Sequence, residues 1–163
     1  MNFKLLFFGF ILFSISLNAQ TKSDNNAELN KLIETFRISI IEHNDFEKFS
    51  NLFLHDTISW GAIPTGETKK NLLKKRPGIA FLTSNYKSFF EGLEKGSEEK
   101  FYNVEIDVRD EFATISFDYS FIMNSKILNW GTEYWSLIIV NNEWKITSVT
   151  WSQNMQQIEA CPF

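Results

Sequence analysis

Residues 129–152, NWGTEYWSLIIVNNEWKITSVTWS, contain two runs of strand-forming side chains on either side of the pair Asn141-Asn142. Asparagine adopts a positive φ more readily than most residues, and both central residues of a tight hairpin turn require one. The stretch therefore predicts two long antiparallel strands, with Val140 opposite Glu143. In this register one face of the sheet collects a single row of residues: Ile139, Trp144, Leu137, Ile146, Trp135, Ser148, Glu133, Thr150, Gly131 and Ser152.

This predicted face is apolar near the turn and polar at its far end, where Glu133, Ser148 and Thr150 lie. A hydrophobic floor with a few placed polar groups is typical of a small-molecule pocket. We therefore expect a ligand to bind against this face. The opposite, outer face of the sheet carries a strip of large apolar side chains. We expect a homodimer to form through this face, because an exposed apolar strip favours association. Its large side chains are Trp130, Tyr134, Val149 and Trp151.

Residues 101–122 form a second predicted hairpin, with Asp110-Glu111 at the turn. Alternation puts one set of pairs in the core: Val108 with Ala113, Ile106 with Ile115, Val104 with Phe117 and Tyr102 with Tyr119. A three-residue loop near residues 124–126 would place Phe117 opposite Glu133, and a two-residue loop would turn Glu133 outward. We favour the first register, because it buries Trp135 and its apolar neighbours; in the second, Glu133 is a surface residue.

The first part of the domain is predicted to be mainly helical. Apolar residues recur every three or four positions over residues 27–43, which indicates an amphipathic helix. Asp45 is the expected N-cap of a short second helix, and a third is expected over residues 84–95. Between them, residues 56–62 alternate as a strand does.

Residues 1–19 have the pattern of a secretory signal peptide: one lysine, an apolar run and a small residue, Ala19, before the expected cut. The run is short for a membrane span, which needs about 20 residues, and no cysteine follows it to carry a lipid. We expect export to the periplasm or the extracellular space without a stable membrane anchor. The rest divides into a flexible leader (20–26), one folded domain (27–153) and a tail (154–163).

The net charge of −4 gives no general reason to expect nucleic-acid binding. The histidines, His43 and His55, have no His or Cys partner at ligand spacing, so neither a metal site nor a cofactor is predicted. A basic segment between Pro64 and Gly78 contains Lys69, Lys70, Lys74, Lys75 and Arg76. It is either a solvated loop or a lid that draws an anionic ligand to the pocket.

The element order, together with FLHDTISW (residues 53–60) and EWKITSVTWS (residues 143–152), resembles the SnoaL-like and nuclear transport factor 2-like (NTF2-like) superfamily. The resemblance implies a cone-shaped α+β domain, with three N-terminal helices packed on a curved, mainly antiparallel sheet around a deep pocket. Enzymatic members such as ketosteroid isomerases place an acidic base near the first strand and a second acid or a tyrosine in the sheet or the first helix. Asp56 and Glu133 match these places, but the first helix offers no tyrosine.

Two functions follow from this sequence. One is an exported domain that binds a small, partly apolar molecule without catalysis, the ligand being anionic if the basic segment is a lid. The other is a cofactor-free lyase, isomerase or hydrolase that transfers protons through Glu133 with Asp56 or His55. Catalysis gains support if these groups share one cavity, and binding gains support if Asp56 and His55 face water. The expected ligand contacts are Trp60, Phe89, Phe117, Trp135, Ser148 and Thr150.

Overall fold

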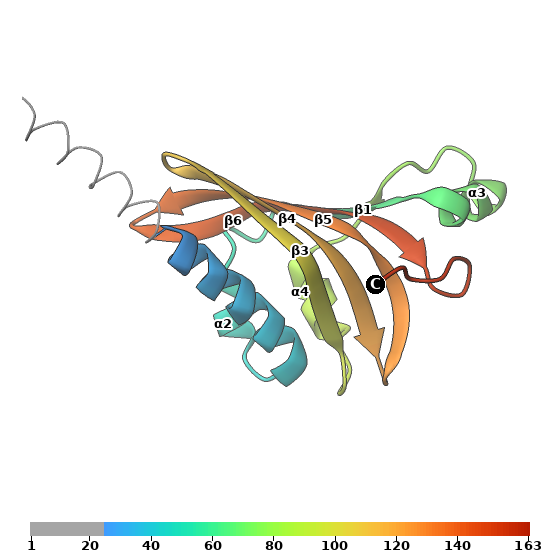
Figure 1. The fold of residues 1–163 in the computed structure, drawn as a ribbon, viewed down its shortest axis with the longest axis horizontal. Helices are drawn as coiled ribbons and strands as arrows, with labels where there is room; N and C mark the ends of the chain where they lie inside the picture. Colours follow the sequence, from blue (N-terminus) through green and yellow to red (C-terminus); the bar gives the residue numbers. More distant parts are fainter. Residues whose placement is uncertain (1–24) are drawn as a thin grey trace, which may run out of the picture.

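The computed structural model describes residues 25–163, so the predicted signal peptide lies outside the described residues. A curved six-stranded sheet, in the order β2-β1-β6-β5-β4-β3, is antiparallel throughout except where β1 pairs with β6. Figure 1 shows helices lying against its concave face. The strands are β1 (Ser59–Pro64), β2 (Leu82–Thr83), β3 (Glu98–Arg109), β4 (Phe112–Met123), β5 (Lys126–Val140) and β6 (Glu143–Met155).

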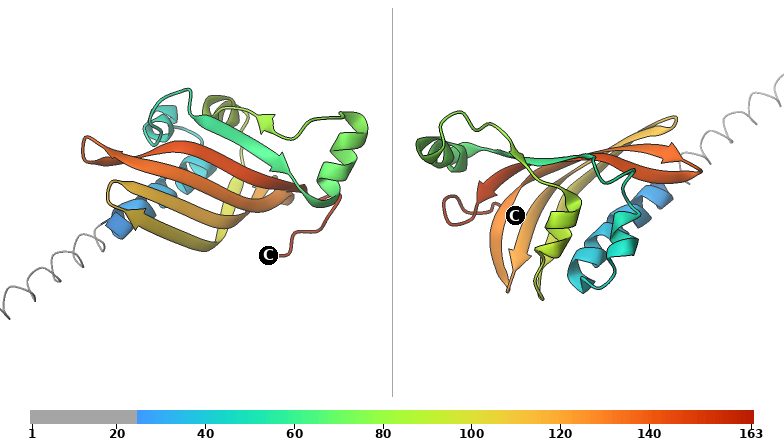
Figure 2. Two further views of the ribbon diagram at one scale, coloured as in Figure 1. Left: turned by 90° about the horizontal axis from the view of Figure 1, so that it is seen from above. Right: turned by 180° about the vertical axis from the view of Figure 1, so that it is seen from behind.

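The concave face is covered by a long helix over residues 25–42, by α2 (Phe46–Ser50) and by α4 (Tyr86–Glu91). Asp45 caps α2 as predicted, since its carboxylate accepts a hydrogen bond from the backbone N–H of Lys48 at 2.8 Å. A fourth helix, α3 (Gly66–Lys75), contacts β6 and β1 at one end of the sheet (Figure 2). The structure does not confirm a set of three N-terminal helices: α4 follows β1, as the third helix was expected to do, and α3 is a further helix between β1 and β2.

The β5–β6 hairpin begins in the predicted register, with Val140 opposite Glu143 and Leu137 opposite Ile146. An extra residue at Thr147 then shifts the pairing, so that Trp135 faces Val149 and Glu133 faces Trp151. Because side chains alternate with a period of two, one extra residue exchanges the two faces of β6 beyond the bulge. Val149 and Trp151 consequently join the concave face, whereas Ser148 and Thr150 turn to the outer face.

The predicted outer apolar strip therefore does not form. Trp130 remains on the outer face, but the chain's own C-terminal tail covers it: its indole N–H donates to the carbonyl of Glu159 at 2.9 Å, and the Phe163 ring packs edge-on at 6.1 Å. Of the four residues, Tyr134 alone is largely exposed, at 59 %. A homodimer through this face stays a prediction, without the strip that motivated it.

The β3–β4 hairpin has its turn at Asp110-Glu111, and Ile106 faces Ile115 as predicted. Further along, residues 103 and 104 form a bulge in which Asn103 has a φ of 51°. The expected partner of Tyr119 is therefore wrong, since Phe101 rather than Tyr102 faces it, and Phe117 lies opposite the bulge. The bulge turns Phe101 and Glu99 toward the concave face.

The connection between β4 and β5 is one residue shorter than predicted, and one extra residue in β5 compensates for the difference in register. Asn124 and Ser125 form a two-residue turn, and both have positive φ. Three residues later, Leu128 is an extra, unpaired residue in β5. Together they give the register expected of a three-residue loop, with Phe117 opposite Glu133. Glu133 therefore faces the concave side, as predicted. Within residues 25–163, no helix is long and apolar enough to cross a membrane.

Candidate functional site

A cavity of about 280 Å³ lies between the helices and the concave face of the sheet. Most of its wall is apolar and aromatic, and a small number of polar side chains interrupt it, which is the usual composition of a ligand site. The lining residues are Phe36, Trp60, Ser88, Phe89, Gly92, Leu93, Glu99, Tyr119, Phe121, Met123, Asn129, Glu133, Trp151 and Gln153.

Glu133 reaches the cavity from the middle of β5 and is only 4 % exposed. The indole N–H of Trp135, two residues along the same strand, donates a hydrogen bond to its Oε1 atom. This bond favours the charged carboxylate, but burial disfavours it more strongly. The balance raises the pKa of Glu133 from its ordinary value of 4.5 to about 7. The predicted direction of this pKa shift is confirmed.

Glu99 is the second carboxyl of the cavity, and our sequence-based reasoning missed it. It lies in β3, is 5 % exposed and lines the same cavity. Burial raises its pKa well above the usual range, and the nearby charge of Glu133 raises it further. The bulge at Asn103 turns Glu99 inward, and that asparagine, a residue tolerant of positive φ, was the one signal in the sequence.

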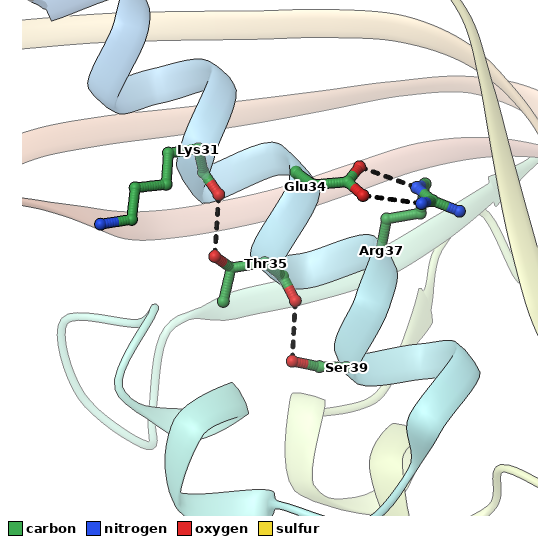
Figure 3. Close-up of polar contacts among 5 residues, drawn as sticks. All are labelled: Lys31, Glu34, Thr35, Arg37 and Ser39. Atoms are coloured by element: carbon green, nitrogen blue, oxygen red, sulfur yellow. Dashed lines mark hydrogen bonds and ion pairs between the residues drawn. The ribbon is translucent and has the colours of Figure 1, made fainter.

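No basic side chain neutralises this carboxyl pair. The ion pairs found within residues 25–163 involve neither Glu99 nor Glu133. Arg37 follows the cavity residue Phe36 on the long helix, but its guanidinium binds Glu34 through two hydrogen bonds of 2.8 and 2.7 Å (Figure 3). The negative charge of the cavity is therefore left without a protein counterion in the described chain.

Tyr119 and Asn129 are further polar residues of the lining. The Tyr119 hydroxyl donates toward Asn129 Oδ1 and the carbonyl oxygen of Ser152, at 3.0 and 3.1 Å. Burial and the two nearby glutamates raise the pKa of Tyr119, so the phenol stays neutral. At neutral pH this region holds a partly ionised Glu133, a neutral phenol and Glu99, whose burial favours the protonated carboxyl. It can thus donate and accept hydrogen bonds, and Glu133 can exchange a proton.

The structure does not bring the other two predicted catalytic residues to this cavity. His55 and Asp56 are exposed in the segment before β1, which begins three residues after Asp56. The imidazole Nδ1 of His55 accepts a hydrogen bond from the backbone N–H of Thr57 at 3.3 Å. Neither side chain lines the cavity. Of the predicted catalytic residues, Glu133 alone remains, and its titratable neighbours in the lining are Glu99 and Tyr119.

The predicted ligand contacts divide into three groups. Trp60 and Phe89 line the cavity. Phe117 and Trp135 are buried in the core beside it, each 1 % exposed, and do not belong to its lining. Ser148 and Thr150 also lie outside the lining, because the bulge at Thr147 turns them to the outer face.

The basic segment lies apart from the cavity. Lys69 to Lys75 belong to α3, and Lys70 forms an ion pair with Glu67 on the same helix. No residue of α3 lines the cavity. The described part of the chain contains no cluster of three or more His, Cys, Asp or Glu residues that could hold a metal ion.

No protein-family model and no curated protein sequence matches the chain. Solved structures do. A candidate scytalone dehydratase from Novosphingobium aromaticivorans superposes with a TM-score of 0.61 at 16 % identity, covering 84 % of this chain and 89 % of that one. An NTF2-like protein with a cystatin-like fold from the same organism gives 0.61 at 12 % identity, with 86 % and 88 % covered.

An NTF2-like protein of unknown function from Shewanella baltica gives a TM-score of 0.58 at 11 % identity, covering 81 % of this chain and 95 % of that one. The superpositions establish a shared fold, and at sequence identities this low they say nothing about activity. This chain therefore has the NTF2-like, cystatin-like α+β fold.

Proposed function

We propose that the chain binds a small, partly apolar molecule in the cavity between the helices and the sheet. The observation that carries this proposal is the composition of the lining, in which aromatic walls surround two buried carboxyl groups. The exposure of His55 and Asp56 supports binding over the catalytic arrangement expected from the sequence. The cavity volume of about 280 Å³ is close to the lower end of the range of small-molecule sites, roughly 300–1,000 Å³. A single ring with a short polar substituent fits that space.

A second candidate function is acid–base catalysis without a cofactor, as in a lyase, isomerase or hydrolase. The observation that favours it is the carboxyl pair. Glu133, whose pKa is about 7, would accept a proton from the ligand. Glu99, whose pKa is also raised by burial, would in its protonated form donate a hydrogen bond to the oxygen that gains charge. Two neighbouring acids, of which one accepts the proton and the other donates a hydrogen bond, are a common way to divide these roles.

A substitution at the cavity mouth tests binding directly. Ser88 is exposed and also lines the cavity, so its side chain lies where the cavity meets solvent. Ser88→Trp should fill the entrance without disturbing the core. Lys87→Trp is the matched control, because Lys87 is an exposed neighbour on α4 that does not line the cavity.

Wild type and both variants would be purified from the protein's own host and examined by native mass spectrometry. We expect a bound small molecule in the wild type and in Lys87→Trp, and none in Ser88→Trp. Equal occupancy in all three proteins would show that any bound molecule lies elsewhere, and the binding proposal would be wrong.

We also propose that the protein is exported. The support is the pattern of residues 1–19, which have one lysine, an apolar run and Ala19 before the expected cleavage point. Its test is given with the other predictions below.

A further inference from the structure

We propose that the ligand of this cavity is a cation, namely a small organic amine with an apolar or aromatic substituent. This inference rests on the proposed binding function and specifies its ligand class. Three features of the described residues support it: the charges that line the cavity, the aromatic rings around them, and the absence of an internal counterion.

Every side chain of the lining that can carry a charge near neutral pH is acidic. The titratable groups of the lining are Glu99, Glu133 and the neutral phenol of Tyr119, and no Lys, Arg or His belongs to it. Both carboxyls are at least nine-tenths buried, and neither is paired with a cation within residues 25–163. Burying a carboxylate without a partner is costly, and a paired positive charge relieves that cost. An ammonium group supplies both the positive charge and the hydrogen-bond donors that a carboxylate accepts.

The walls suit a cation as well. Trp60 packs against Trp151 with ring centroids 5.8 Å apart, and against Phe89 at 5.5 Å. Phe89 continues the row to Phe121 at 6.0 Å. All four rings line the same cavity as the two glutamates. Aromatic faces attract cations through their quadrupoles, and grouped aromatic rings recognise ammonium ligands in this way.

Other ligand classes fit the cavity less well. An anion would meet Glu99 and Glu133 with no basic side chain in the lining. A neutral carbonyl compound would accept a hydrogen bond only from a protonated carboxyl, so its binding should weaken as the pH rises. An amine should behave in the opposite way. It binds best to the ionised carboxylates, and each carboxyl that is protonated beforehand must release its proton to solvent.

The test uses three probes that share a phenyl ring and differ in charge: 2-phenylethylamine, 2-phenylethanol and phenylacetate. Calorimetric titration of the full protein at pH 8 should show the amine binding at least about tenfold more tightly than the alcohol, a difference of about 1.4 kcal/mol. Phenylacetate should bind most weakly. The affinity for the amine should fall about tenfold or more between pH 8 and pH 5.5, and titrations in buffers of different ionisation enthalpy should detect proton release at pH 7.

The double variant Glu99→Gln, Glu133→Gln keeps the side-chain shapes and removes the charges. It should lose the preference for the amine, so that amine and alcohol bind it with similar affinity, and a near-ultraviolet circular dichroism spectrum like that of the wild type should show that the aromatic cavity is intact. If alcohol and amine bind the wild type equally, the cavity binds small molecules but the inference of a cationic ligand is wrong. If none of the three probes binds at millimolar concentration, that inference is overturned. Retention of a host-derived molecule by the wild type but not by Ser88→Trp would then leave the general binding proposal standing.

Discussion

Replacing Glu133 with glutamine should stabilise the protein, and the gain should increase with pH. Glutamine has nearly the same shape, and its carbonyl oxygen can still accept the hydrogen bond from the Trp135 indole. What it removes is the free-energy penalty of ionising a buried carboxyl. That penalty follows from the pKa of Glu133, which is about 7 in the folded protein against an ordinary value of 4.5.

The sign and size follow from proton linkage. Below pH 4.5 the carboxyl is protonated in both states, so ionisation has no effect on stability. Between pH 4.5 and 7 the unfolded chain loses the proton while the folded protein keeps it, and the free energy of unfolding falls by about 1.4 kcal/mol per pH unit. Above pH 7 both states are ionised and the loss levels off at about 3 kcal/mol, the difference between 4.5 and 7 at that rate.

The variant should therefore exceed the wild type by less than about 1 kcal/mol at pH 5 and by about 3 kcal/mol at pH 8. Removing the charge of Glu133 also lowers the pKa of Glu99 toward its usual value, which adds to the gain. Urea unfolding followed by tryptophan fluorescence at the two pH values measures the difference. Glu105→Gln, at an exposed position of β3, is the control and should change little at either pH. An equal difference at pH 5 and pH 8 would contradict the reasoning.

Two further predictions concern the sheet and the N-terminus. Gly131→Ala should destabilise the protein by about 2 kcal/mol or more, because a Cβ there would overlap the backbone carbonyl oxygen of Ser152; unchanged urea unfolding would show that the strands separate easily at this point. A reporter fused after residue 22 should be carried across the inner membrane of a bacterial host and cleaved after Ala19, as N-terminal sequencing would show. An uncut fusion in the cytoplasm would remove the case for export.

Local chemistry was enough to predict the turns and the helix faces. Asn141-Asn142 and Asp110-Glu111 form the two predicted hairpin turns, because hairpin turns depend on residues that tolerate their backbone angles. The helical periodicity of residues 27–43 predicted the long helix to within two residues, and Asp45 predicted the start of α2. The α+β class also followed from these patterns. The inward orientation of Glu133 was predicted from a three-residue loop, and it arises instead from a two-residue turn followed by an extra residue at Leu128.

The tertiary structure decided which groups meet in the cavity. Bulges at Thr147 and at residues 103–104 each add one residue to a strand. Apolar and polar residues alternate along the strand on both sides of a bulge. The alternation therefore shows which neighbouring residues share a face of the sheet, but it does not show at which residue the strand changes face. That exchange brings Glu99 and Trp151 into the cavity and turns Ser148 and Thr150 out of it. Only the packing of the helices on the folded sheet selects the side that is buried, and burial then raises the pKa of both glutamates.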